Sequence, residues 1–196
     1  MQAGDGLTGR FRALAGFVGP AAFITAWAAF GAQTAGYSPT RDPISLLAAA
    51  DAPTRAAMTA ALVACGAGVG VYSRELGSVL PGGAGPAAMV TAAATLGIAF
   101  TPLHSALGGA PHAIAAGLAY ASLAGIPLLA APTLARRART QAARASVAFG
   151  VGAGACLTWS VITPDDVGLW QRAGLSIGHA WLMISAVSIA CSRQQP

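Results

Sequence analysis

The stretch that decides the fold is Leu14–Ala35, LAGFVGPAAFITAWAAFGAQTA, which contains no charged side chain. A helix needs about 20 predominantly apolar residues to cross the hydrocarbon core of a bilayer. The surrounding sequence, Phe11–Phe30, lacks the small-residue cleavage site that follows the apolar core of a secretory signal. We therefore interpret this run as a first transmembrane span.

Five more apolar runs follow along the chain, at about residues 56–72, 87–103, 112–134, 145–162 and 169–190. Charged residues or turn residues separate them, and the glycines and prolines of Leu80–Pro86 break any helix there. Pro127 lies inside the fourth run, where neighbouring membrane helices can satisfy the carbonyl that it leaves free. The pattern predicts an all-α, polytopic integral membrane bundle of six transmembrane helices, forming a single domain over residues 1–196.

Composition supports this fold class. Hydrophobic residues make up 55% of the 196 positions and charged residues only 9%, and the mean hydropathy is +0.62. A soluble domain carries about a quarter charged residues, so most of this surface must face lipid. The 25 glycines suit close helix–helix approach in a membrane. Three cysteines without CxxC spacing argue against a disulfide scaffold or a zinc site, and we expect no metal or other cofactor.

The arginines predict the orientation of the bundle. With six spans, both termini share one side with the second-to-third and fourth-to-fifth connections. That side would carry Arg10, Arg12, Arg74, Arg136, Arg137, Arg139, Arg144 and Arg193, whereas the other would carry Arg41, Arg55 and Arg172. Since cytoplasmic loops are enriched in basic residues, we expect both termini to be cytoplasmic in a multi-pass protein of the bacterial inner membrane. The net charge of +5 then reflects orientation, not nucleic-acid binding.

This orientation gathers polar residues on the outer face. Outer loop 36–55 contains Tyr37 and the Arg41-Asp42-Pro43 sequence, and we expect a short interfacial or re-entrant helix there from Asp42 to about Ala50. Asp42 is placed to cap that helix, with Pro43 at its first position and Arg41 as an ion-pair partner. The alternative is functional: Arg41 binds an anionic group and Asp42 acts as an acid.

The other two outer loops contribute histidines and acids. His104 and His112 flank the second loop, and Asp165, Asp166 and Arg172 surround the third. Asp165 either starts the last helix or acts chemically, and the adjacent pair completes no D-D-x-x-D diphosphate site. A haem or metal site would need another ligand, such as His179, to converge with His104 and His112.

His179 is the strongest single candidate, because it lies about ten residues into the sixth span. An ionisable residue inside a span is costly and marks a functional site by default. A structural alternative is a hydrogen bond to a neighbouring helix or a place beside a small wet cavity.

Three motifs resemble a known family. The stretch Tyr37–Leu47, YSPTRDPISLL, looks like the Y-S-P-x-R-D-P-I-S-x-L signature of the bacterial membrane family of unknown function DUF998. Phe100-Thr-Pro102 followed by His112, and Gly168-Leu-Trp-Gln-Arg172, are similar to two looser motifs of the same family.

The resemblance covers essentially the whole chain and implies a six-span fold with an outer-face site around Arg41, Asp42, His112 and Arg172. One departure is Leu103-His104, where the family often has an aspartate, so His104 either replaces that aspartate or marks a different activity. The resemblance implies no reaction.

These residues support three hypotheses. The favoured one is a membrane-embedded enzyme that acts by acid–base chemistry on a lipid or isoprenoid, in a cyclase-like or hydrolase-like reaction at an outer-face pocket. In it, Asp42 or Asp165 is the acid, His112 or His179 the base, Arg41 or Arg172 the anion clamp, and Tyr37 and His104 contact the substrate. One alternative is a small permease, but the cytoplasmic half of the spans lacks the charges that would form a polar pathway across the membrane. The other alternative is a non-catalytic accessory or sensor protein. The expected partner is a membrane lipid or lipophilic small molecule, and a homo-oligomer is compatible with the sequence.

Overall fold

The computed structural model describes residues 2–193, with side-chain surroundings from Leu7 onward. In this part of the chain, six long α-helices alternate in direction: α1 (Gln2–Gln33), α2 (Arg55–Val79), α3 (Ala84–Phe100), α4 (Ala110–Arg136), α5 (Thr140–Ile162) and α6 (Val167–Ser192). Two short 3₁₀ helices, η1 (Ile44–Ala48) and η2 (Pro164–Asp166), lie in the connections. The prediction of an all-α bundle is confirmed.

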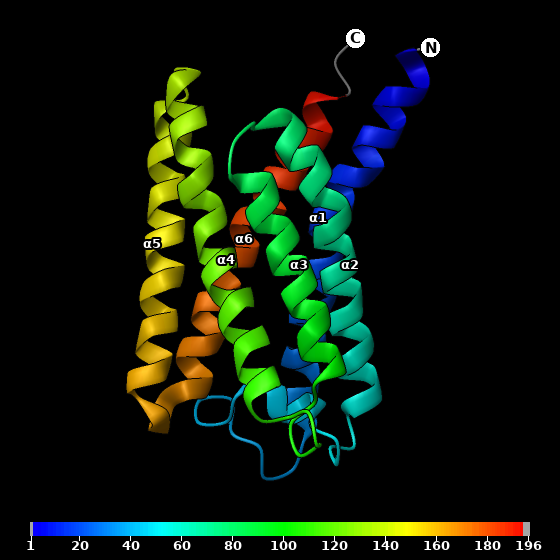
Figure 1. The fold of residues 1–196 in the computed structure, drawn as a ribbon, viewed down its shortest axis with the longest axis vertical. Helices are drawn as coiled ribbons and strands as arrows, with labels where there is room; N and C mark the ends of the chain where they lie inside the picture. Colours follow the sequence, from blue (N-terminus) through cyan, green and yellow to red (C-terminus); the bar gives the residue numbers. More distant parts are fainter. Residues whose placement is uncertain (1, 194–196) are drawn as a thin grey trace.

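The six helices form a closed ring. Each helix packs against the next along the chain, and α6 returns to pack against α1. The beginning of α1 and the end of α6 lie at one end of the bundle, which we call the termini end (Figure 1). The connections 34–54, 101–109 and 163–166 lie at the opposite end, the loop end.

By helix length and hydropathy, the chain is a multi-pass membrane protein. Five helices are long and apolar enough to cross a bilayer, namely residues Leu7–Gln33, Arg55–Val79, Ala110–Arg136, Thr140–Ile162 and Pro164–Ser192. The remaining helix, α3, is apolar but has only 17 residues. Many valines, leucines and isoleucines project outward from the bundle, as expected for a surface that faces lipid.

Close approach of α1 and α2 depends on glycines. A Cβ atom on Gly16 would lie 2.4 Å from the ring of Tyr72, and one on Gly68 would lie 2.6 Å from the carbonyl oxygen of Ala15. Small residues at such contacts allow membrane helices to pack through van der Waals attraction.

Several helix ends differ from the predicted spans. The second run was expected to end at Arg74 and Glu75, but α2 continues to Val79 because the buried Glu75 carboxylate accepts a 2.5 Å hydrogen bond from Arg193. The third run was expected to reach Leu103, whereas α3 ends at Phe100, just before the Thr101-Pro102 pair. A residue that precedes proline is disfavoured in helical geometry.

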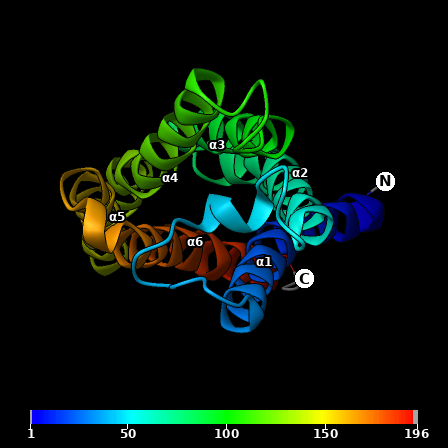
Figure 2. The ribbon, with the colours of Figure 1, turned by 90° about the horizontal axis from the view of Figure 1, so that it is seen from below.

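The short helix of the first loop exists, but its position and cap differ from the prediction. It covers Ile44–Ala48, and Figure 2 shows it inside the ring at the loop end. Ile44, Leu47 and Ala48 are buried, so the segment plugs the loop end of the bundle. Pro43, not Asp42, occupies the N-cap position, and no side chain caps the helix.

Candidate functional site

A central cavity of about 210 Å³ lies inside the ring, in the half of the bundle nearer the loop end. Its middle is apolar and is formed by side chains such as Phe23, Leu62, Ile98, Leu123 and Leu175. Helix η1 closes it at the loop end through Ile44, Ser45 and Ala48. The lining residues that carry polar groups are Ser45, Cys65, Thr91, Thr95, His112, Tyr120, Gln171 and His179.

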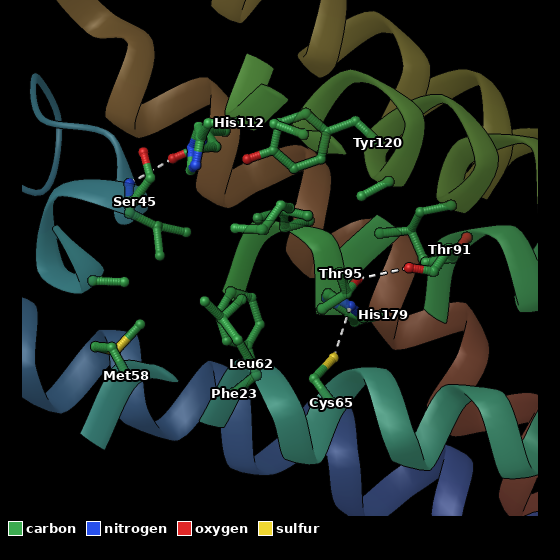
Figure 3. Close-up of a pocket in the computed structure, with 18 residues that line it drawn as sticks. Phe23, Ser45, Met58, Leu62, Cys65, Thr91, Thr95, His112, Tyr120 and His179 are labelled. Carbon is green, nitrogen blue, oxygen red and sulfur yellow. Dashed lines mark hydrogen bonds between the residues drawn. The ribbon is translucent and has the colours of Figure 1, made fainter. Parts of the chain in front are cut away.

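His112 lies near the mouth of the cavity, close to Ser45 (Figure 3). It is only 8% exposed, and its Nδ1 is 2.6 Å from the carbonyl oxygen of Thr101. A carbonyl can only accept, so Nδ1 carries the proton, and Nε2 of the neutral ring is left with its lone pair. This is the arrangement in which a histidine accepts a proton from a bound molecule.

His179 lies at the deeper end of the cavity and is 3% exposed. Its Nε2 is 3.7 Å from Sγ of Cys65, and the ring packs edge-on against Phe23. Nδ1 has no hydrogen-bond partner within the described part of the chain, although it faces the carbonyl of Leu175 one turn earlier. His179 therefore lies beside a cavity, as the structural alternative predicted, and the same position allows it to contact a molecule bound there.

Gln171 and Tyr120 also line the cavity, although the sequence analysis did not single them out. Gln171 Oε1 accepts a 2.6 Å hydrogen bond from the backbone N–H of Ile44, and Tyr120 lies beside the Gln171 side chain. Residues eight apart, a little over two helical turns, lie on the same side of a helix. Gln171 therefore shares a face of α6 with His179, and Tyr120 shares a face of α4 with His112. The eight-residue spacing from a histidine was the signal in the sequence that could have identified both residues.

We call residues 36–54 the lid, because they include η1 and cover the cavity. Arg172 holds the lid to α6: one terminal nitrogen donates to the carbonyls of Pro39 (2.6 Å) and Asp42 (3.0 Å), and the other donates to the Tyr37 hydroxyl. The guanidinium also lies 5.4 Å from the ring centres of Tyr37 and Trp27. Arg172 is 8% exposed and outside the cavity lining, so its observed role is to bind the lid.

Tyr37 and Asp42 shape the lid itself. The Tyr37 hydroxyl donates to the carbonyls of Asp42 and Pro43, and burial raises the pKa of this hydroxyl despite the neighbouring Arg172 charge. The Asp42 carboxylate accepts a 2.7 Å hydrogen bond from the Ser38 N–H. Both side chains therefore stabilise a compact turn, and neither lines the cavity.

The remaining candidates lie on the surface of the loop end. Arg41 is exposed and, within the described residues, makes no ion pair with Asp42, contrary to the pairing considered from the sequence. Asp165 is exposed in η2. His104 Nδ1 lies 2.8 Å from Asp51 Oδ1, which connects the second loop to the lid. This hydrogen bond lowers the pKa of Asp51.

Backbone hydrogen bonds complete the attachment of the lid. The N–H of Ala50 donates to the Leu103 carbonyl, and the N–H of Leu169 donates to the Thr40 carbonyl, both at 2.8 Å. The lid is therefore bonded to the 101–109 connection and to the first turn of α6. A Cβ on Gly168 would lie 2.4 Å from the Asp42 carbonyl oxygen, so only glycine allows α6 to approach the lid this closely.

Of the eight predicted site residues, the structure brings only His112 and His179 into the cavity lining. Arg41, Asp42, Asp165, Arg172, Tyr37 and His104 lie in or against the lid and loops. In the part of the chain that the structure describes, no carboxylate lines the cavity. Nor do three His, Cys, Asp or Glu side chains there come together as a metal site would require.

The comparisons with known proteins identify a family without an assigned activity. No curated protein and no solved structure is detectably similar to the chain. The family model described as "Protein of unknown function (DUF998)" matches residues 17–188, which include α2 to α5, most of α6, the second half of α1, the lid and every residue that lines the cavity. The chain therefore belongs to the DUF998 family.

Proposed function

We propose that the protein is a membrane-embedded enzyme that binds a small lipophilic molecule in the central cavity and exchanges a proton with it through His112. The observation that carries this proposal is an apolar cavity with an oriented histidine at its mouth, where Nε2 is free to accept a proton. Ligand sites have this composition: a mostly apolar wall with a few placed polar groups.

The dimensions of the cavity limit the substrate. Gln171 and His179 line opposite ends and are eight residues apart on α6, which corresponds to about 12 Å along the helix. An apolar cavity of about 150 Å³ holds a benzene ring, so 210 Å³ accommodates a short isoprenoid or an aromatic compound, not a whole phospholipid. A polar group at one end of such a molecule would meet His112, Tyr120 and Gln171.

The chemistry favoured by this arrangement is proton abstraction by an imidazole. Acid-initiated chemistry with Asp42 or Asp165 as the donor would require those carboxylates to reach a ligand, and they lie outside the cavity lining. Within the apolar cavity, Tyr120 and Gln171 could hold the charge that develops on a substrate oxygen, since preorganised hydrogen-bond donors are most effective where water is excluded.

The permease alternative is less well supported. Between the cavity and the termini end, the side chains of Tyr72, Ile126 and Leu182 are fully buried on three different helices. These three side chains belong to one packed layer, in which the Tyr72 hydroxyl is bonded to Ser185, whereas a transporter exposes its site to both sides in turn. Helix rearrangement around this layer would be the signature of transport.

For the orientation, we propose six membrane crossings with both termini in the cytoplasm of a bacterial inner membrane. The termini end carries eight of the eleven arginines, which agrees with the positive-inside rule. The cavity and lid then face the outside. Reporter fusions after Val79 and Ile162 test this: the first should report the cytoplasm and the second the exterior.

Binding is tested by analysing what the protein carries. Wild-type protein, purified in a mild detergent, should yield a small lipophilic compound on solvent extraction and mass spectrometry. Ala119→Phe fills the cavity wall and should deplete this compound, whereas Ala113→Phe, on the exposed face of the same helix, should not. Equal amounts in both folded variants would contradict binding in this cavity.

The proton-transfer role is tested with His112→Asn. The asparagine N–H can replace Nδ1–H and keep the bond to Thr101, but it has no counterpart of Nε2. Binding of the extracted compound should persist while its turnover falls by about 10²- to 10⁴-fold, the usual contribution of a general base. Asp165→Asn, exposed in η2, is the control. If turnover survives in His112→Asn, His112 is not the general base, and only its role in binding remains.

A further inference from the structure

A second hollow lies in the other half of the bundle. In Figure 1, α5 and α6 lie close together at the loop end and diverge toward the termini end. Between them is a groove of about 180 Å³, which we call the termini-end groove. It is distinct from the central cavity, with which it shares no lining residue.

The groove has apolar walls and opens on the outer surface of the bundle. Leu80, Leu134 and Phe149 form much of its inner wall, and the exposed side chains of Ile184 and Ser188 mark its opening. The polar groups of the inner wall are already satisfied by one another, since Trp181 Nε1 donates a 2.9 Å hydrogen bond to Ser146 Oγ. The inner groove is therefore suited to an apolar chain.

The mouth of the groove is basic. Arg139 lines it directly, and Arg136 and Arg137 precede it by three and two residues, whereas Arg144 lines a different hollow between α4 and α5. All four are exposed, and none forms an ion pair with an acidic residue that the structure describes. The acid described at this end, Glu75, is bound to Arg193. The apolar groove thus meets an uncompensated positive charge at its rim.

We propose that the termini-end groove binds an anionic phospholipid, with one acyl chain between α5 and α6 and the phosphate against Arg139. A lipid combines the two required chemistries, an apolar chain and an anionic headgroup, and reaches the groove directly from the bilayer. Basic pockets between membrane helices on the cytoplasmic side bind such headgroups. A zwitterionic lipid fills the groove equally well but gains no net attraction from the arginines.

Trp181 provides the readout, because it lines the groove. In the variant Trp27→Phe, Trp159→Phe, Trp170→Phe it is the single tryptophan. This protein is reconstituted in phosphatidylcholine vesicles that contain a small fraction of phosphatidylglycerol with brominated acyl chains, which quench tryptophan fluorescence on contact. Quenching of Trp181 should exceed the value for random lipid contact. Brominated phosphatidylcholine at the same fraction should quench only at that value.

Arg139→Gln should lower the preference for phosphatidylglycerol roughly fivefold, as expected for one arginine near an anionic surface. Arg74→Gln, an exposed arginine at the same end and outside the groove, is the control. Ser188→Phe fills the opening of the groove and should abolish the excess quenching. Equal quenching by the two brominated lipids, or an unchanged preference in Arg139→Gln, would overturn the proposal. Loss of the excess quenching on addition of inorganic phosphate would assign the site to the free anion instead.

Discussion

Replacement of Arg172 by methionine should release the lid from the cavity. Methionine keeps an unbranched side chain of similar reach but removes every hydrogen bond that the guanidinium donates to Pro39, Asp42 and Tyr37. It also removes the cation from between the Tyr37 and Trp27 rings. The perturbation therefore acts on the attachment of the lid, not on the residues that line the cavity.

The size of the effect follows from these contacts. A hydrogen bond from a charged group contributes about 1.5–3 kcal/mol, and three such bonds join Arg172 to the lid. Because the released carbonyls can bind water at the bundle end, we expect a net loss of only about 2–3 kcal/mol. Since 1.4 kcal/mol is a factor of ten in an equilibrium constant, the population of the open lid should rise roughly 30- to 150-fold.

Cys65 reports this opening, because it lines the cavity and is 1% exposed. In a background with Cys156→Ala and Cys191→Ser it is the single thiol. Its rate of reaction with a small methanethiosulfonate reagent should follow the open population when closing is faster than labelling. Arg172→Met should therefore accelerate labelling by a factor within the range above.

The control is Arg41→Met, which removes a positive charge from the same lid at an exposed position. It should leave the labelling rate of Cys65 nearly unchanged. If Arg172→Met labels within about threefold of the parent protein while remaining folded, the lid does not depend on Arg172. If both variants accelerate labelling equally, charge and not the observed hydrogen bonds holds the lid.

Two further predictions concern the lid. Gly168→Ala should also accelerate Cys65 labelling, since its Cβ would collide with lid carbonyls. Gly125→Ala, in open space on α4, should not. Equal rates in the two variants would contradict the close approach of α6 to the lid. The second prediction is a pH dependence. The His104 hydrogen bond depresses the pKa of Asp51. The Asp51–His104 bond therefore stabilises the lid fully above the ordinary pKa range of aspartate, and this stabilisation is lost as pH falls through the depressed pKa. Because the thiolate is the reactive form, the labelling rate of Cys65 is divided by that of a free thiol at the same pH. This ratio should rise slightly at acidic pH, and Asp51→Asn should remove that rise; an identical profile in the variant would show that another group titrates.

The sequence predicted the helices well, because apolar runs record the contact between a helix and lipid directly. It predicted their ends less well. The extension of α2 past Glu75 depends on Arg193, 118 residues away. A local pattern contains no information about such a partner, and a charged pair at the end of a run normally indicates a loop.

The candidate site was predicted in part. His179 was recognisable because an ionisable residue within a span needs an explanation, and His112 was implied by the family resemblance. Gln171 was missed because a single polar residue near a span end is ordinary, and Tyr120 because a tyrosine does not interrupt an apolar run. Only the position of each residue on the same helical face as a histidine distinguishes it.

For the lid, the sequence suggested ligand contacts where the structure shows contacts within the protein. Arg41, Asp42 and Arg172 form a conspicuous polar motif, and polar motifs on loops usually suggest ligand contacts. In the structure, Asp42 and Arg172 are occupied by backbone groups of the lid. Backbone acceptors are present at every residue, so a sequence cannot indicate which of them will capture a side chain.

The closure of the ring by α6 has a consequence for the biogenesis of the protein. Arg172 binds the carbonyl of Pro39, which is 133 residues earlier in the chain. At a synthesis rate of about 5–20 residues per second, the ribosome needs roughly 7–27 s to make that intervening chain. During this time the lid has been synthesised but has no α6 to hold it, and Gln171 and His179 are absent. A nascent chain that stalls before its sixth helix therefore has no closed cavity, so a molecule that requires the closed cavity can bind only after synthesis of the sixth helix is complete.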